Sequence, residues 1–116
     1  MFLPLNHQNL DVYKASHEML LECYNVTKQL PQEERFNLIS QLRRASLSVK
    51  LNIAEGASRK SPAERKRFYE IARGSVIEID AALNAAVALQ YIAMENLQHL
   101  GVLLNRCFSM LCKMIG

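Results

Sequence analysis

Four long segments of the sequence repeat apolar residues every three or four positions, and this periodicity restricts the chain to a helical fold. In the first segment the repeat consists of Val12, Ala15, Met19, Cys23, Val26 and Leu30. Such spacing keeps one apolar stripe along a helix, whereas a half-buried strand would alternate apolar and polar residues. The repeats predict helices at about residues 8–30, 33–57, 62–92 and 96–114. In the third helix, the predicted core face consists of Phe68, Ile71, Ala72, Ser75, Ile79, Ala82, Ala86 and Leu89.

Short motifs separate the predicted helices. Pro31 ends the first helix because proline cannot continue the backbone hydrogen-bond ladder. Gly56 is expected to end the second helix as a left-handed cap, and the motif SPAE at residues 61–64 is typical of a helix start. Because the connections are short, we predict an all-α fold, an antiparallel up-down-up-down four-helix bundle. The 116 residues are expected to form one domain, residues 1–116.

Composition and cysteine usage favour a cytoplasmic protein. The sequence has no apolar run of about 18 residues that could span a membrane, and its start lacks the basic and apolar regions of a signal peptide. Cys23, Cys107 and Cys112 lie in apolar helical contexts and form no CxxC pair. They are therefore expected to be free thiols that pack as small hydrophobic residues.

Positive charge is concentrated in the middle of the sequence. The segment Arg35–Arg73 contains ten of the fourteen Lys and Arg residues but three of the eleven acidic residues, although the chain carries a net charge of only +3. The candidate contacts to nucleic acid in this segment are Arg43, Lys50, Arg59, Lys60, Arg65, Lys66 and Arg67. The last five crowd the turn and the start of the third helix, where cations oppose the helix dipole. A phosphate-binding role would explain them, and a solvated hairpin tip is the alternative. Aromatic side chains for base stacking are not clustered in the sequence, so any binding would depend on the phosphate backbone.

A stripe of polar residues follows the second predicted helix, beside its apolar stripe. A structural polar network is predicted from Gln41, Arg44, Ser48, Asn52 and Glu55 of this helix with Ser75 and Glu78 of the next. In this network a buried Arg44 is expected to be hydrogen-bonded to Glu78 and Ser75. The alternative is that the stripe lines a groove that contacts a ligand or RNA.

Additional apolar residues fall off the predicted core faces. They are Leu47, Leu51, Ala54, Val76, Ile77 and Val87. An exposed apolar surface of this kind favours self-association, so we expect a homo-oligomer. Gly74, in the middle of the third helix, is expected to allow a neighbouring helix to pack closely.

No arrangement of residues typical of catalysis is present. His7, His17 and His99 lie on different segments, and the motifs HExxH, ExxH and GxSxG and a Gly-rich phosphate-binding loop are absent. We therefore expect no enzymatic activity, no catalytic residue, no metal, no cofactor and no small-molecule substrate.

Many of these residues form a pattern that resembles a known family. The matched positions are QLRRA (Gln41–Ala45), Ser48, NIAEG (Asn52–Gly56), Arg59, Phe68, Ala72, Gly74-Ser75 and Glu78, with Leu10–Ser16 and Pro31–Leu38. On this pattern the chain resembles the bacterial four-helix-bundle family encoded in 23S rRNA intervening sequences, whose members are often labelled as ribosomal proteins. It departs from the family at Lys50-Leu51, where relatives commonly carry Pro or small residues.

The resemblance implies a four-helix bundle with no known catalysis and a role linked to rRNA. The family is also similar to the accessory variability protein of diversity-generating retroelements, a basic pentameric ring that binds nucleic acid and a reverse transcriptase. A ring-like homo-oligomer, with a pentamer favoured, is therefore implied. The expected function is the binding of structured RNA by a non-enzymatic oligomeric bundle. The alternative is a protein–protein interaction scaffold or accessory subunit that does not bind nucleic acid directly.

Overall fold

Four α-helices and no strands make up the fold, as the predicted all-α class requires. The computed structural model describes residues 1–116. The helices are α1 (Asp11–Thr27), α2 (Leu38–Ala57), α3 (Pro62–Ala88) and α4 (Gln98–Ile115). Short 3-10 helices, η1 (Asn6–Asn9), η2 (Gln32–Glu34) and η3 (Met94–Leu97), precede α1, α2 and α4. None of the helices has the length and apolar character needed to cross a membrane.

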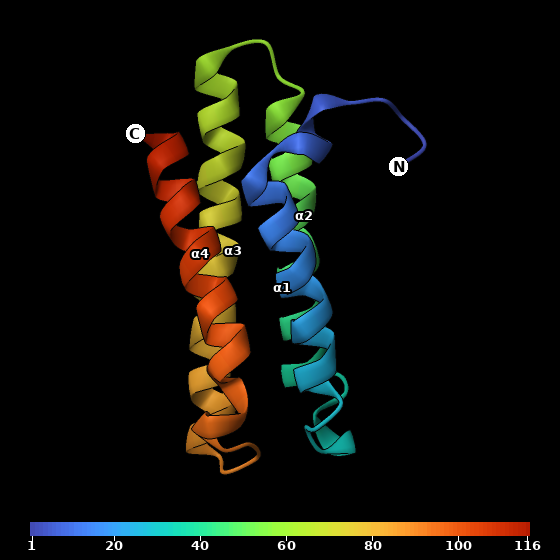
Figure 1. Ribbon diagram of the computed structural model, residues 1–116. Coiled ribbons are helices and arrows are strands. Elements are labelled where there is room, and N and C mark those ends of the chain that lie inside the picture. The colour runs from blue at the N-terminus through green and yellow to red at the C-terminus, as the bar shows by residue number, and fades with distance from the viewer.

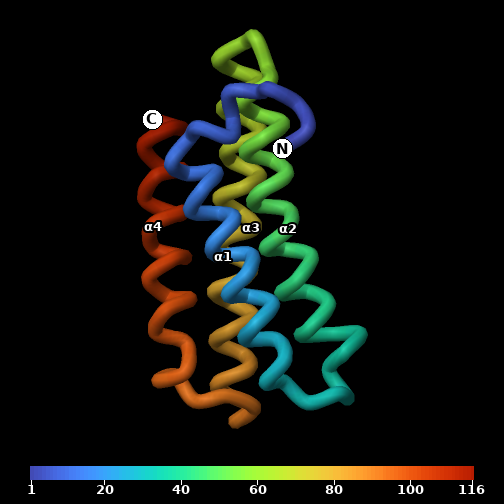
Figure 2. Tube along the Cα trace, turned by 45° about the vertical axis from the view of Figure 1, so that its right-hand side comes forward, coloured from blue at the N-terminus to red at the C-terminus, as the bar shows by residue number.

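The helices lie side by side, and each packs against two others. α2 and α4 both contact α1 and α3, so the helices enclose a single core. The chain reverses direction at every connection (Figures 1 and 2). The start of α1, the connection between α2 and α3, and the end of α4 consequently lie at the same end of the molecule (Figure 1).

The core contains the stripe predicted for the first helix, but in α3 only Ala72, Ile79 and Ala86 of the predicted face are buried, so the buried face is partly rotated from the predicted one. All six residues of the first stripe are buried. In α3, however, Ile71 is exposed, as is Leu89 directly after the helix, whereas Tyr69, Val76 and Leu83 are buried. α3 carries apolar residues around most of its circumference, and the buried face is the one that points between α2 and α4.

The helices are shorter than predicted where the chain turns. η2 replaces the first predicted turn of the second helix, and α2 begins only at Leu38. α3 ends at Ala88 because Gln90 adopts a φ of 64°, and the N–H of Tyr91 donates to the carbonyl of Ala86 at 3.0 Å. This arrangement is typical of a left-handed helix end, here without the usual glycine.

Two glycines have roles that differ from those predicted. Gly56 lies inside α2 without a positive φ, so the prediction of a left-handed cap is wrong. A Cβ atom at this position would lie 2.8 Å from Cε1 of Tyr69 and 3.0 Å from Cβ of Phe68. The missing side chain therefore allows α3 to approach the end of α2. Gly74 has no atom within 4 Å of the corresponding position, so the prediction of close packing there is wrong.

Candidate nucleic-acid interface

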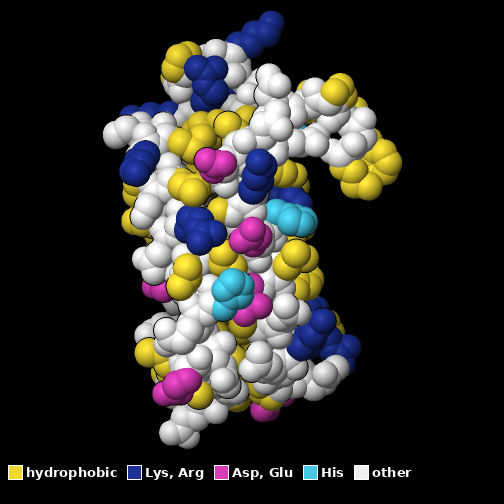
Figure 3. Space-filling view, viewed as in Figure 1, with side chains coloured by type: hydrophobic (Ala, Val, Ile, Leu, Met, Phe, Trp, Pro, Cys, Tyr) yellow, Lys and Arg dark blue, Asp and Glu magenta, His cyan; other side chains and the backbone are white.

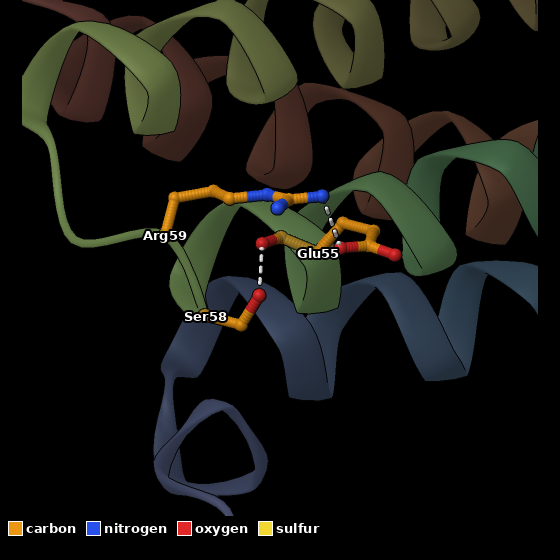
Figure 4. A network of polar contacts seen from close by, with 3 residues as sticks. All are labelled: Glu55, Ser58 and Arg59. Carbon is orange, nitrogen blue, oxygen red and sulfur yellow. Dashed lines mark hydrogen bonds and ion pairs between the residues drawn. The ribbon is translucent and has the colours of Figure 1, made fainter.

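The connection between α2 and α3 is held in one conformation by local hydrogen bonds. Ser61 caps α3 by accepting a hydrogen bond from the backbone N–H of Glu64 at 3.3 Å. Ser58 donates its hydroxyl to the carbonyl of Glu55 at 2.6 Å, and Arg59 forms an ion pair with the Glu55 carboxylate at 3.0 Å (Figure 4). These contacts fix the positions from which the neighbouring cations project.

Five of the seven predicted nucleic-acid contacts lie at this connection, and we call them the basic turn: Arg59, Lys60, Arg65, Lys66 and Arg67. Arg65 is structural, because its Nη1 donates to the carbonyls of Arg59 and Lys60, both at 2.9 Å. The guanidinium of Arg59 lies over the ring of Phe68 at 4.9 Å, and that of Arg67 lies 6.0 Å from the same ring. Lys60 and Lys66 are exposed and have no hydrogen-bond or ion-pair partner. Figure 3 shows Lys and Arg side chains gathered at this end of the molecule.

Arg43 and Lys50 do not belong to the basic turn, because both point toward α1. Arg43 Nε donates to Oγ1 of Thr27 at 2.9 Å, and its guanidinium lies 4.7 Å from the ring centre of Tyr24. Arg43 and Arg59 are sixteen residues apart, which corresponds to about 24 Å along a helix. The seven candidates therefore form two separate groups rather than one surface.

The predicted polar network is much smaller in the structure. Asn52 Nδ2 donates to the carbonyl and the hydroxyl of Ser48 at 2.9 and 3.1 Å, and Ser75 Oγ donates to Ser48 Oγ at 3.0 Å. These three half-buried residues join α2 to α3. A three-residue hydrogen-bonded group of this kind fixes the register of two helices and leaves no charge buried.

Four members of the predicted network lie outside it, which corrects the prediction. Arg44 and Glu78 are both exposed and do not pair, and Gln41 is exposed without a side-chain hydrogen bond. Glu55 pairs with Arg59 instead. Ser75 is level with Ser48 rather than with Arg44, so the register of α2 against α3 differs from the predicted one by one helical turn. The charged side chains of Arg44 and Glu78 remain in water, where they pay no desolvation penalty.

The interior contains no unsatisfied polar group that would mark a ligand site. Every buried side-chain nitrogen and oxygen atom has a hydrogen-bond partner, and no group of three His, Cys, Asp or Glu residues is placed to hold a metal ion. A groove of about 320 Å³ between α3 and α4, lined by residues that include Ile77, Asp80 and Phe108, has mostly apolar walls. Burial raises the pKa of the Cys23 and Cys107 thiols to about 11, so neither resembles an activated nucleophile.

Aromatic side chains accompany both groups of cations, a feature that the sequence did not reveal. Phe68 lies beneath Arg59 in the basic turn, Tyr24 beneath Arg43, and the Tyr13 ring 5.4 Å from Nζ of Lys50. The tyrosines and their cations come from different helices, so only the packing of α1 on α2 brings them together. The one available signal was the spacing of eleven residues between Tyr13 and Tyr24, which places both on one side of a helix.

Comparison with known proteins identifies the family. No curated protein matches the sequence. The sequence model of one family, described as 23S rRNA-intervening sequence protein, matches residues 8–113. This match covers α1, α2, the basic turn, α3 and all but the last two residues of α4, and the chain therefore belongs to the 23S rRNA-intervening sequence protein family.

Proposed function

We propose that this four-helix bundle is a non-enzymatic, homo-oligomeric protein that binds structured RNA through its basic turn. The observation that carries the proposal is the pair of exposed, unpartnered ammonium groups of Lys60 and Lys66 on a rigid connection. The family description, which refers to 23S rRNA, supports RNA as the ligand.

The electrostatics of the basic turn support an anionic partner. Between residues 55 and 70 its five cations are accompanied by three carboxylates, Glu55, Glu64 and Glu70, and Glu55 is already paired with Arg59. Cations at the start of α3 oppose the helix dipole, so they do not stabilise the helix on which they lie. RNA phosphates would neutralise this charge and release counterions, which favours binding at low salt.

The test is the binding of a 23S rRNA fragment at two salt concentrations. If Lys60, Lys66 and Arg67 each contact one phosphate, log K should fall against log[salt] with a slope of roughly −2 to −3. The double variant Lys60→Glu/Lys66→Glu should bind about 10-fold or more weakly at low salt. The matched control is Arg35→Glu/Arg44→Glu, which changes the charge equally at two exposed residues that have no ion pair. Absence of binding at low salt, or binding without salt dependence, would refute the proposal.

Exposed apolar side chains support the proposed oligomer. Leu47 is 41% exposed, Leu51 54%, Ile71 43% and Ile77 54%, and in the N-terminal arm Phe2 is 88% exposed. Such side chains are typical of a surface that another subunit covers. The resemblance described above favours a pentamer, and light scattering of the purified protein measures the subunit number. A monomer would contradict this part of the proposal.

The same apolar side chains support the second candidate function, a protein–protein scaffold without RNA. In that case Lys60→Glu/Lys66→Glu would leave the protein complex intact, and the rRNA fragment would not bind. The rRNA fragment therefore separates the two functions, because the wild type binds it in the first and does not bind it in the second.

A further inference from the structure

The side of the bundle formed by α1 and α2 carries a row of cation–aromatic pairs that the basic turn does not explain. We call it the α1–α2 face and define it by Tyr13, His17, Tyr24, Arg43 and Lys50. Lys50 Nζ lies 2.9 Å from Nδ1 of His17 and 5.4 Å from the ring centre of Tyr13. Arg43 is held over Tyr24 by its hydrogen bond to Thr27. The two pairs are about 16 Å apart, because eleven helical residues separate the tyrosines.

Acidic residues are absent from this face. Asp11, Glu18 and Glu22 of α1 are rotated by roughly 120–180° from the two tyrosines, at about 100° per residue. Glu18 accordingly contacts Arg106 of α4, at 3.8 Å. Glu55, the one acidic residue of α2, pairs with Arg59. The α1–α2 face is therefore uniformly basic where the aromatic rings are exposed.

The tyrosines on this face are only partly used by the fold. Tyr24 is 36% exposed, whereas Tyr13 is half-buried, packs against the core and contacts the ring of His7 edge-on at 4.8 Å. Neither hydroxyl has a hydrogen-bond partner, whereas Tyr91 donates its hydroxyl to Glu34 at 3.3 Å. Exposed cation–aromatic pairs contribute little to the stability of a fold, so folding alone does not explain these pairs. Aromatic rings and guanidinium planes are, in contrast, the groups on which unpaired bases stack.

We propose that the α1–α2 face binds unpaired nucleotides of RNA, with bases stacked against the Tyr13–Lys50 and Tyr24–Arg43 pairs and phosphates held by the same two cations. This inference rests on the proposed function insofar as the ligand is RNA, but it uses a different surface from the basic turn. The separation of about 16 Å between the rings corresponds to about five nucleotides at the rise of roughly 3.4 Å per stacked base. A base-paired duplex cannot use this face in the same way, because its bases already stack on each other.

The experiment compares two RNA probes, an unpaired oligonucleotide of about twelve nucleotides and a duplex of equal charge, by fluorescence anisotropy. Tyr24→Leu and Tyr13→Leu should each weaken binding of the unpaired probe about 10-fold and leave the affinity for the duplex unchanged within about 2-fold. Tyr24→Phe keeps the ring and should bind like the wild type, and Tyr91→Leu is the control for a tyrosine outside the face. The chain contains no tryptophan, so tyrosine emission can be followed, and the part of its quenching that Tyr13→Leu and Tyr24→Leu remove reports stacking on these two rings.

The outcomes separate this inference from the proposed function. If Lys60→Glu/Lys66→Glu weakens both probes while the Tyr13 and Tyr24 variants bind unpaired RNA like the wild type, RNA binding stands and the α1–α2 face is not a site. Equal losses for both probes in Tyr24→Leu would also overturn base stacking. If neither probe binds the wild type at low salt, both proposals are wrong.

Discussion

Replacing Gly56 with alanine tests whether close helix approach, rather than backbone flexibility, explains this glycine. The new methyl group would lie 2.8 Å from a ring carbon of Tyr69 and 3.0 Å from Cβ of Phe68. Favourable carbon–carbon separations are about 3.5–4.0 Å, and the Phe68 Cβ moves only with the α3 backbone, so α3 must shift away from α2. Overpacking of this kind destabilises by roughly 1–3 kcal/mol, and the preference of helices for alanine over glycine offsets about 1 kcal/mol. We expect a net loss of about 1 kcal/mol, which lowers Tm by roughly 4 °C in a chain of this size.

The matched control for this substitution is Gly74→Ala. A methyl group at Gly74 meets no atom within 4 Å, so only the helix preference remains, and Tm should rise by a few degrees. Thermal unfolding followed by circular dichroism measures both variants, and Gly56→Val should destabilise more than Gly56→Ala. A Gly56→Ala protein that melts at or above the wild-type temperature would refute the close-approach explanation.

Three further predictions concern the polar stripe and the buried thiols. Arg44→Met should change the free energy of unfolding by less than about 0.5 kcal/mol in denaturant titrations, because Arg44 is exposed and unpaired. A loss of several kcal/mol would instead indicate that Arg44 forms a buried ion pair. Ser75→Ala removes the hydrogen bond to Ser48 and should destabilise by about 0.5–1.5 kcal/mol in the same assay, and an unchanged value would show that this bond does not contribute. Burial raises the pKa of Cys23 and Cys107 from 9.0 to about 11, so the unfolded state loses these protons first. Stability should therefore fall between pH 9 and 11 by about 1.4 kcal/mol per pH unit for each thiol. The free energy of unfolding should fall less steeply with pH in Cys23→Ala/Cys107→Ala. An equally steep fall would contradict the raised pKa of the two thiols.

The sequence predicted the helices well because each depends on a local pattern. The first stripe is buried as predicted because its apolar residues occupy one narrow side of α1. α3 was predicted less well, since its apolar residues surround the helix and periodicity alone does not say which of them face a neighbour. Ile71, which was predicted to face the core, is consequently exposed, and Val76, which was predicted to lie off the core face, is buried.

Relations between helices were harder to predict than the helices themselves. A helical repeat gives the side of α2 on which Arg44 lies, but it does not give the register of α2 against α3. The predicted register was wrong by one turn, so Arg44 was expected beside Ser75, whereas Ser48 lies there. The division of the candidate cations had the same cause. Arg43 and Lys50 were grouped with the basic turn because all lie in one stretch of sequence, whereas their contacts, Tyr24 and His17, belong to α1.

The order in which the helices meet has a consequence for how the protein folds. α1, α2 and α3 each pack on the helix that follows, and the contact of α4 with α1 is the one that joins distant parts of the chain. Such a low contact order is typical of proteins that fold on the order of microseconds to milliseconds. On the ribosome, however, α1 and α3 can pack on α2 while their sides that face α4 remain uncovered. These apolar sides are covered only when the last helix, Gln98–Ile115, packs on α1 and α3.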